Sequence, residues 1–265
     1  MTALFEALGV TKRFGGLTAV ASVDFILDAG IASVIGPNGA GKTTLFNIFT
    51  GLYGADAGSV TFKGQPLLGL RPDQITALGI CRTFQNIRLF ANMTAIENVL
   101  VGMHARIRLG LWDVLSRRPV FRMTEGRLAA RAAALLERVG LRASANDVAR
   151  NLPYGGQRRL ELARALASEP SLLLLDEPTA GMTQAEASAL MDLLRGLVAD
   201  LGLAIILIEH NMRVVMEVSD RVTVLDHGEK IAEGRPREVQ SNPRVVQAYL
   251  GTRQPGRRRE DHAQR

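Results

Sequence analysis

One stretch of nine residues constrains this chain more than any other, because it fits the pattern G-x-x-x-x-G-K-[ST]. A short apolar run over residues 31–35 precedes it and predicts a buried strand, whereas residues 45–49 continue as a helix. Glycines at such a junction let backbone N–H groups approach an anion, and the helix N-terminus adds partial positive charge. The stretch consists of Gly36, Pro37, Asn38, Gly39, Ala40, Gly41, Lys42, Thr43 and Thr44.

Two side chains at the end of this loop complete a phosphate-binding site. Lys42 supplies a movable positive charge for the β- and γ-phosphates, and the Thr43 hydroxyl is placed to hold a magnesium ion. A glycine-rich turn without a ligand is the alternative, but the full match in this strand and helix context favours the phosphate site. We therefore predict that the chain binds a nucleoside triphosphate together with Mg²⁺.

Length and composition restrict the protein class. The 265 residues suit one large domain or two closely joined lobes, and the 47% hydrophobic and 22% charged content is typical of a soluble globular protein. A single cysteine, Cys81, excludes an internal disulfide. No apolar run approaches the roughly 20 residues that span a bilayer, and the N-terminus lacks a signal pattern. We therefore expect a cytoplasmic protein, with docking on a membrane left open.

The formal net charge of +6 is unevenly distributed along the chain. Much of it lies in a Pro- and Gly-containing tail, on Arg253, Arg257, Arg258, Arg259 and Arg265. A solvated, disordered end over residues 252–265 and a polyanion-binding arm both fit this composition, which favours the first. No nucleic-acid-binding motif is present, so no nucleic-acid partner is expected.

The N-terminal third predicts an antiparallel β lobe beside the sheet that carries the phosphate loop. Residues 4–10 and 20–27 have strand patterns, and residues 59–62 form another. Phe14 lies between the first two strands, flanked by polar residues and glycines. It is a candidate stacking platform for adenine, and burial in the core is the alternative. Residues 80–84 then predict a strand that ends at Gln85, which either contacts a metal ion or water or is a surface amide.

The middle of the chain predicts a helical lobe inserted into the α/β core. Thr94 and Glu97 form a capping box that starts a helix running towards residue 105, and a helical apolar pattern extends from Thr124 to a stop at Gly140. The basic segment between them, residues 112–121, is either a surface for a partner or a membrane edge, or a solvated loop.

A second helix in the sequence begins with glycines and therefore offers free N–H groups. Residues 151–157 lead into a helical stretch over residues 158–166, so that an anion site and a plain helix start are both possible. The candidate binding residues are Tyr154, Gly155, Gly156 and Gln157.

Acids and a histidine follow two further buried strands. The run 172–175 ends in Asp176 and Glu177, where a magnesium-holding aspartate and a glutamate that polarises the attacking water are expected. Thr183 and Glu186 form a second capping box. The run 204–208 ends beside His210, which either donates a hydrogen bond to the γ-phosphate or is structural.

In this order the motifs resemble those of the ATP-binding subunits of ABC transporters, over roughly residues 4–250. The resemblance implies an α/β fold: a P-loop NTPase (RecA-like) core with a mainly parallel sheet, an antiparallel β lobe and an inserted α-helical lobe. By position it assigns the nucleotide-binding motifs: the aromatic A-loop is Phe14, the Walker A loop residues 36–44, the Q-loop Gln85 and the signature motif residues 154–157. It also assigns the Walker B aspartate to Asp176, the catalytic glutamate to Glu177 and the switch histidine to His210. Catalysis is thereby assigned to Glu177, His210, Gln85 and Lys42, and Mg²⁺ binding to Thr43, Gln85 and Asp176.

Finer details are similar to one branch of this family. Residues 82–90, 154–159, 209–212 and 234–251, with the long insertion at residues 104–125, resemble the ATPase subunits of high-affinity branched-chain amino-acid importers. Tyr154 and Thr183 depart from the residues that the wider family usually has there. The likeness implies one ATP-binding domain over residues 1–251, with a helical lobe at about 92–168 and a branch-specific segment at about 228–251.

The resemblance also implies partners, because such ATPases work as head-to-tail pairs in which each ATP lies between two subunits. We expect a second ATP-binding subunit, integral membrane permease subunits and a solute-binding protein that acts through them, with the chain peripheral on the cytoplasmic face of the inner membrane. Uptake of branched-chain amino acids is the main hypothesis. Alternatives are a same-branch ATPase for urea, amides or lipopolysaccharide export, and a soluble ABC ATPase of translation or DNA repair.

Overall fold

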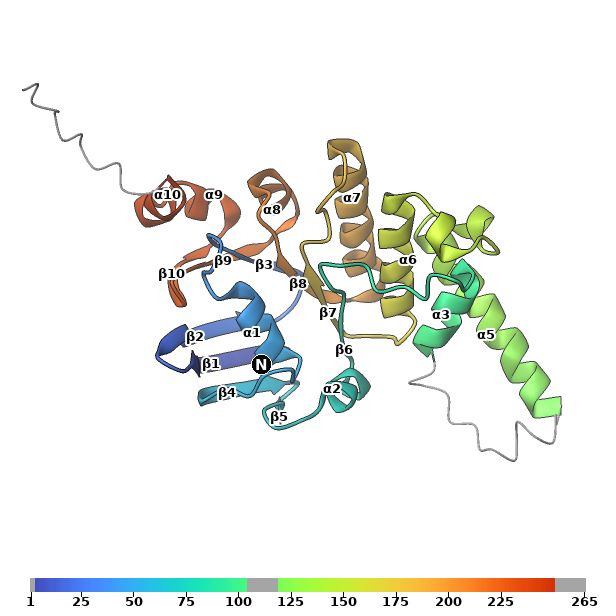
Figure 1. The fold of residues 1–265 in the computed structure, drawn as a ribbon, viewed down its shortest axis with the longest axis horizontal. Helices are drawn as coiled ribbons and strands as arrows, with labels where there is room; N and C mark the ends of the chain where they lie inside the picture. Colours follow the sequence, from blue (N-terminus) through green and yellow to red (C-terminus); the bar gives the residue numbers. More distant parts are fainter. Residues whose placement is uncertain (1–2, 104–118, 251–265) are drawn as a thin grey trace, which may run out of the picture.

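The computed structural model describes residues 3–103 and 119–250, which form two β-sheets and a set of helices (Figure 1). The larger sheet has six strands in the order β10-β9-β3-β8-β7-β6, all parallel except for the β10 edge. In chain order these strands are β3 (Ile31–Ile35), β6 (Ile80–Arg82), β7 (Leu172–Asp176), β8 (Ala204–Ile208), β9 (Arg221–Asp226) and β10 (Glu229–Gly234). The predicted mainly parallel α/β core is confirmed.

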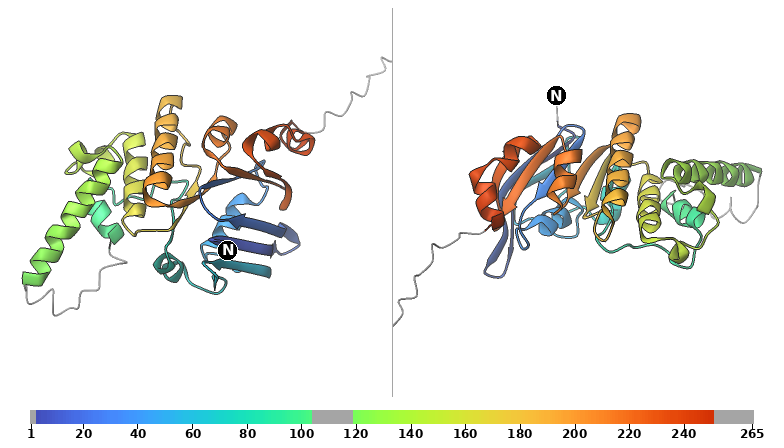
Figure 2. Two further views of the ribbon diagram at one scale, coloured as in Figure 1. Left: turned by 180° about the vertical axis from the view of Figure 1, so that it is seen from behind. Right: turned by 90° about the horizontal axis from the view of Figure 1, so that it is seen from above.

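The smaller sheet is antiparallel and forms the predicted β lobe. Its order is β2-β1-β4-β5, comprising β1 (Phe5–Phe14), β2 (Leu17–Leu27), β4 (Ala57–Phe62) and β5 (Gln65–Pro66). This sheet and the helices α3 (Ala95–Met103) and α5 (Pro119–Arg138) lie at opposite ends of the molecule (Figures 1 and 2). The remaining helices are α1 (Lys42–Phe49), α2 (Pro72–Leu78), η2 (Arg142–Ser144), η3 (Ala149–Asn151), α6 (Tyr154–Leu166), α7 (Gln184–Leu201), α8 (Met212–Val218), α9 (Pro236–Gln240) and α10 (Pro243–Leu250).

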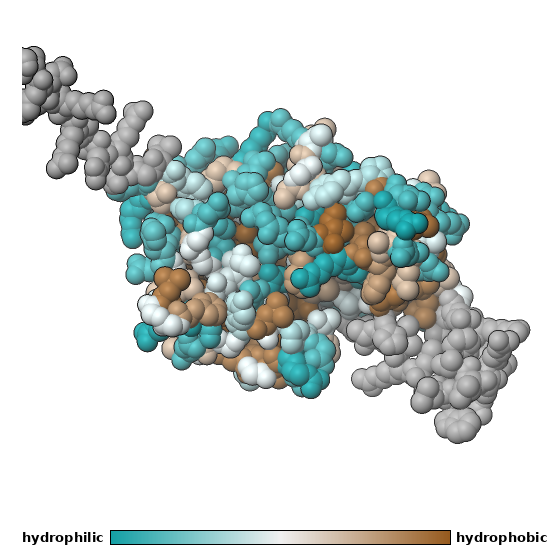
Figure 3. Space-filling model, in the orientation of Figure 1, coloured by the Kyte–Doolittle hydropathy of each residue, from teal (hydrophilic) through white to brown (hydrophobic). Residues whose placement is uncertain are grey.

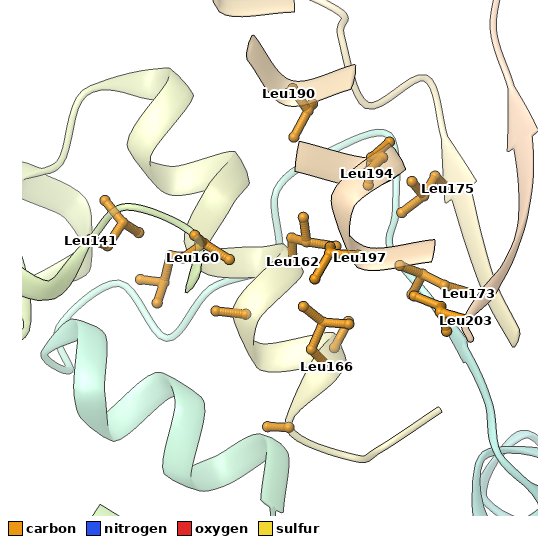
Figure 4. Close-up of a cluster of buried hydrophobic side chains, with 14 of the residues drawn as sticks. Leu141, Leu160, Leu162, Leu166, Leu173, Leu175, Leu190, Leu194, Leu197 and Leu203 are labelled. Carbon is orange, nitrogen blue, oxygen red and sulfur yellow. The ribbon is translucent and has the colours of Figure 1, made fainter. Parts of the chain in front are cut away.

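The central strands are buried on both faces, because successive side chains of a strand alternate between two cores. Leu172 and Leu174 of β7 pack towards the β lobe, where Phe5 and Phe49 meet edge to face with ring centroids 4.7 Å apart. Leu173 and Leu175 pack towards α6 and α7, among the leucines shown in Figure 4. The sheet therefore holds the ends of β3, β7 and β8 rigidly between two packed layers.

Helix starts agree with the two capping boxes. The Thr94 N–H donates to Glu97 Oε2 at 2.7 Å, and the Thr183 N–H donates to Glu186 Oε2 at 2.9 Å, immediately before α3 and α7. Helix α5 ends before Gly140, which has φ +74°. The start of α5 differs from the prediction, because it lies at residue 119 rather than 124. Most of the basic segment 112–121, and the tail 252–265, lie outside the described residues.

Two further predicted boundaries were wrong. Strand β6 ends at Arg82 instead of residue 84, because only the Thr83 N–H still reaches the neighbouring strand, at 3.0 Å from the Leu174 carbonyl oxygen. The carbonyls of Phe84 and Gln85 instead accept hydrogen bonds from Arg158. Helix α6 begins four residues earlier than the predicted stretch, so its glycines lie inside the first turn.

Candidate functional site

Two glycines of the loop between β3 and α1 leave no room for a side chain. A Cβ at Gly36 would lie 2.0 Å from the Leu225 carbonyl oxygen, and one at Gly41 would lie 2.3 Å from the Ala19 carbonyl oxygen. Gly39, with φ +82°, has nothing within 4 Å of the position of a Cβ. The backbone therefore packs tightly at both ends of the loop and is open in the middle, as close approach of a phosphate requires.

Lys42 lies against this loop. Its side chain is only 7% exposed, and Nζ donates to the carbonyl oxygens of Gly36 at 2.8 Å and Pro37 at 2.9 Å. Burial lowers the pKa of Lys42, while the charges of Glu177 and Asp176 act in the opposite direction. The ammonium group is thus held at the loop within the field of both carboxylates.

A hollow of about 400 Å³ adjoins the loop and is lined by residues from the β lobe. Phe14 and Leu17 form part of its wall, together with residues 39–44. The Phe14 ring is 43% exposed and meets the Tyr53 ring edge to face at 5.3 Å between centroids. Phe14 is therefore not a core residue, and its position supports the stacking interpretation.

Asp176 ends β7 and is fixed by a cation that the sequence analysis left without a role. Arg82 Nη2 donates to Asp176 Oδ2 at 2.7 Å, and Arg82 Nη1 donates to Asn47 Oδ1 of α1 at 2.7 Å. The Arg82 guanidinium also lies over the rings of Phe46 and Phe84, at 5.5 and 5.3 Å from their centroids. The sequence offered one signal for this contact, because Arg82 is a charged residue at the end of the otherwise apolar strand β6.

Glu177, Gln85 and His210 converge beside Asp176. Gln85 Nε2 donates to Glu177 Oε2 at 2.9 Å, and His210 Nδ1 lies 3.7 Å from the same oxygen. Glu177 has φ +47°, a conformation that costs a non-glycine residue about 1–3 kcal/mol and that clusters at functional sites. Its N–H donates to the Ile208 carbonyl oxygen at 2.9 Å, so the sheet edge maintains this geometry.

The donor chemistry fits Mg²⁺. Thr43, Gln85 and Asp176 offer hydroxyl, amide and carboxylate oxygens, which are the ligands that a hard cation prefers. Among the described residues no three His, Cys, Asp or Glu side chains gather into a metal-holding group.

The second glycine-containing helix start lies elsewhere. None of Tyr154, Gly155, Gly156 and Gln157 lines the hollow at the phosphate loop. Tyr154 is exposed, and its ring lies next to Gly181, where a Cβ would be 3.3 Å away. The structure thus brings Glu177 together with Gln85 and His210, and the charges of Glu177 and Asp176 act on Lys42. Of the predicted signature residues, Tyr154 is connected to the Gln85 backbone through Arg158.

Known proteins resemble this chain in sequence over most of its length. Residues 21–180 match the family "ABC transporter", and residues 229–254 match "Branched-chain amino acid ATP-binding cassette transporter". The high-affinity branched-chain amino acid transport ATP-binding protein LivG of Salmonella typhimurium is 47% identical over 94% of this chain and 98% of its own length. BraF of Pseudomonas aeruginosa, described in the same words, is 43% identical over 94% of this chain and 98% of its own.

Solved structures show the same likeness. The ADP conformation of MJ1267, an ATP-binding cassette of an ABC transporter, has a TM-score of 0.82 and 30% identity, covering 95% of this chain and 100% of that one. The ATP-binding cassette MJ0796, solved as a dimer in a post-hydrolysis state with ADP and Pi, has a TM-score of 0.74 and 27% identity, covering 88% and 99%.

Proposed function

The chain belongs to the ABC transporter family of ATP-binding proteins, and from this premise we propose that it hydrolyses ATP to power the uptake of branched-chain amino acids. The observation that carries the proposal is the 47% identity to LivG across 98% of that protein's length. The residues of the site also support ATP hydrolysis. Phosphoryl transfer to water requires groups that hold the phosphates, bind the metal ion and position the water, and the phosphate loop, the two acids at the end of β7, Gln85 and His210 can supply them.

The residues divide the reaction between binding and proton transfer. The loop N–H groups and Lys42 hold the β- and γ-phosphates. Glu177 accepts a proton from the attacking water through Oε2, as the water oxygen bonds to the γ-phosphorus and the bond from that phosphorus to the bridging oxygen of ADP breaks. Gln85 and His210 orient Glu177 and the γ-phosphate. Mg²⁺, held by Thr43, Asp176 and Gln85, would neutralise charge that develops on the phosphates.

A second ATP-binding subunit completes the site in our proposal. We assign residues 154–157 to the ATP of a partner subunit, because the likeness to ABC ATPases implies a head-to-tail pair in which the signature motif of one subunit faces the phosphate loop of the other. The α6 N-terminus then adds its free N–H groups and dipole to the γ-phosphate from the opposite side. The dimeric MJ0796 cassette shows that a protein of this fold pairs.

The remaining partners follow from the transport role. We propose permease subunits that contact the surface near Gln85, a solute-binding protein that acts through them, and a peripheral position on the cytoplasmic face of the inner membrane, without a nucleic-acid partner. Within the described ranges, no helix has the length and apolarity required to traverse a bilayer. On the face shown in Figure 3, apolar side chains form separate patches in a largely polar surface.

Reconstitution tests this function. The protein would be co-expressed with permease subunits of a branched-chain amino-acid importer from the same organism, placed in liposomes with their binding protein, and given ATP on its own side. We expect ATP-dependent uptake of labelled leucine, isoleucine or valine. Uptake of urea or an amide in their place would contradict the substrate assignment, and recovery with ribosomes or DNA instead of membrane proteins would contradict transport.

Replacement of Phe14 tests the adenine platform. Phe14→Ala is expected to raise the Kd for ATP about three- to tenfold, because an aromatic contact of this kind contributes about 0.5–1.5 kcal/mol. Phe14→Trp, which preserves a stacking surface, is expected to keep the wild-type Kd. Fluorescence titration with labelled ATP measures both values, and an unchanged Kd for Phe14→Ala would remove the ring from the binding site.

A further inference from the structure

Arg158, in the first turns of α6, connects two parts of the chain that serve different steps. Its side chain is 4% exposed. Nη1 donates to the Phe84 carbonyl oxygen at 2.9 Å and to Glu161 Oε2 at 3.1 Å. Nη2 donates to the Gln85 carbonyl oxygen and, at 3.1 Å, to the Tyr154 hydroxyl. One buried guanidinium therefore joins the backbone of residues 84–85 to the start of α6.

Glu161 connects α6 to one further residue of the same loop, Arg88. It is buried beside Arg158, and its Oε1 accepts a hydrogen bond from the Arg88 N–H at 3.3 Å. The Arg88 guanidinium in turn lies 4.1 Å from the centroid of the Phe84 ring. The loop 84–88 is thus attached to α6 at three backbone positions, and we call this set of contacts the Arg158 clamp.

Stability alone does not account for a clamp of this kind. A buried ion pair is often no more stabilising than well-packed apolar residues, because both charges lose their hydration. Arg158 Nε is moreover buried without a hydrogen-bond partner in the part of the chain that the structure describes. What a planar guanidinium does offer is a fixed fork geometry that holds several acceptors at once.

On the proposed function, the two ends of the clamp serve different ATP molecules. Gln85 contacts Glu177 at 2.9 Å and so serves the ATP on its own phosphate loop. Tyr154 is exposed at the start of α6 and serves, on the proposed function, the ATP of the partner subunit. We propose that Arg158 is a positioning residue that couples the two ATP sites of the dimer, by moving residues 84–88 and the first turn of α6 as one unit. This inference rests on the proposed function.

The test measures cooperativity in the assembled transporter. Arg158→Lys keeps the positive charge beside Glu161 but, as a point donor, cannot hold the two carbonyls and the Tyr154 hydroxyl together. We expect its Hill coefficient for ATP hydrolysis to fall towards about 1 and kcat to fall about tenfold, with the Kd for ATP of the isolated subunit within about twofold of wild type. Arg150→Lys is the matched control, because Arg150 is exposed in the same lobe and donates to Asn92 Oδ1 at 2.7 Å.

A second variant keeps the inference testable if Arg158→Lys fails to fold, which thermal unfolding would show. Tyr154→Phe removes only the hydroxyl at the far end of the clamp and should also lower the Hill coefficient, with little added effect in the double variant. An unchanged Hill coefficient in Arg158→Lys would overturn the inference. If that variant does not fold, an unchanged Hill coefficient in Tyr154→Phe would do so. A Hill coefficient of about 1 in the unmodified transporter would also overturn it. Failure of the wild-type protein to bind ATP would instead contradict the proposed function.

Discussion

Glu177→Gln is expected to bind ATP about as tightly as the wild-type protein and to hydrolyse it about 10²- to 10⁴-fold more slowly. A positioned general base contributes a factor of this size, and an amide cannot take up the proton of the attacking water. The replacement has nearly the same shape, so its oxygen can still accept the hydrogen bond from Gln85 that Glu177 Oε2 accepts at 2.9 Å. Binding and hydrolysis should therefore separate, which single-turnover phosphate release and ATP titration would show.

The same variant should accumulate as a closed pair of ATP-binding subunits when ATP and Mg²⁺ are present. Hydrolysis is the step that reopens the proposed dimer, so blocking it traps the bound state. Size-exclusion chromatography with and without ATP measures the dimer fraction. Glu217→Gln, on the exposed face of α8, is the control and should turn over normally. Rapid turnover by Glu177→Gln would remove Glu177 from its role as base.

Local patterns were sufficient to predict the parts of the site that depend on neighbouring residues. The phosphate loop needs only a strand, its glycines and a helix start, and Asp176 and Glu177 follow a short apolar run that predicts a buried strand. Two capping boxes predicted the starts of α3 and α7 for the same reason. The fold class could be predicted because each of these signals spans fewer than about ten residues.

Features of the site that depend on contacts between distant residues could not be predicted from the sequence. Arg82 holds Asp176 across 94 positions, and Arg158 withdraws the Phe84 carbonyl from the sheet across 74 positions. The second contact explains why the predicted end of β6 was two residues too late. Burial in the core was one of two interpretations of Phe14 until the fold left its ring exposed beside the phosphate loop, and stacking on adenine stays a prediction. Helix α5 begins where the sequence has no apolar period, so no pattern marked residue 119.

Lys42→Ala is expected to weaken ATP binding about 10- to 100-fold, because charge-assisted hydrogen bonds contribute about 1.5–3 kcal/mol each. Only the ammonium form binds phosphate, and burial lowers the pKa of Lys42 from its usual range, with Glu177 and Asp176 opposing the shift. Wild-type affinity should therefore fall as pH rises through this lowered pKa, whereas the affinity of Lys42→Ala should not depend on pH there. Calorimetric titration at neutral and alkaline pH measures both effects.

Lys63→Ala is the control, since Lys63 is exposed on the β lobe and donates to Ser171 Oγ at 2.7 Å. An unchanged affinity in Lys42→Ala would mean that the loop backbone alone holds the triphosphate.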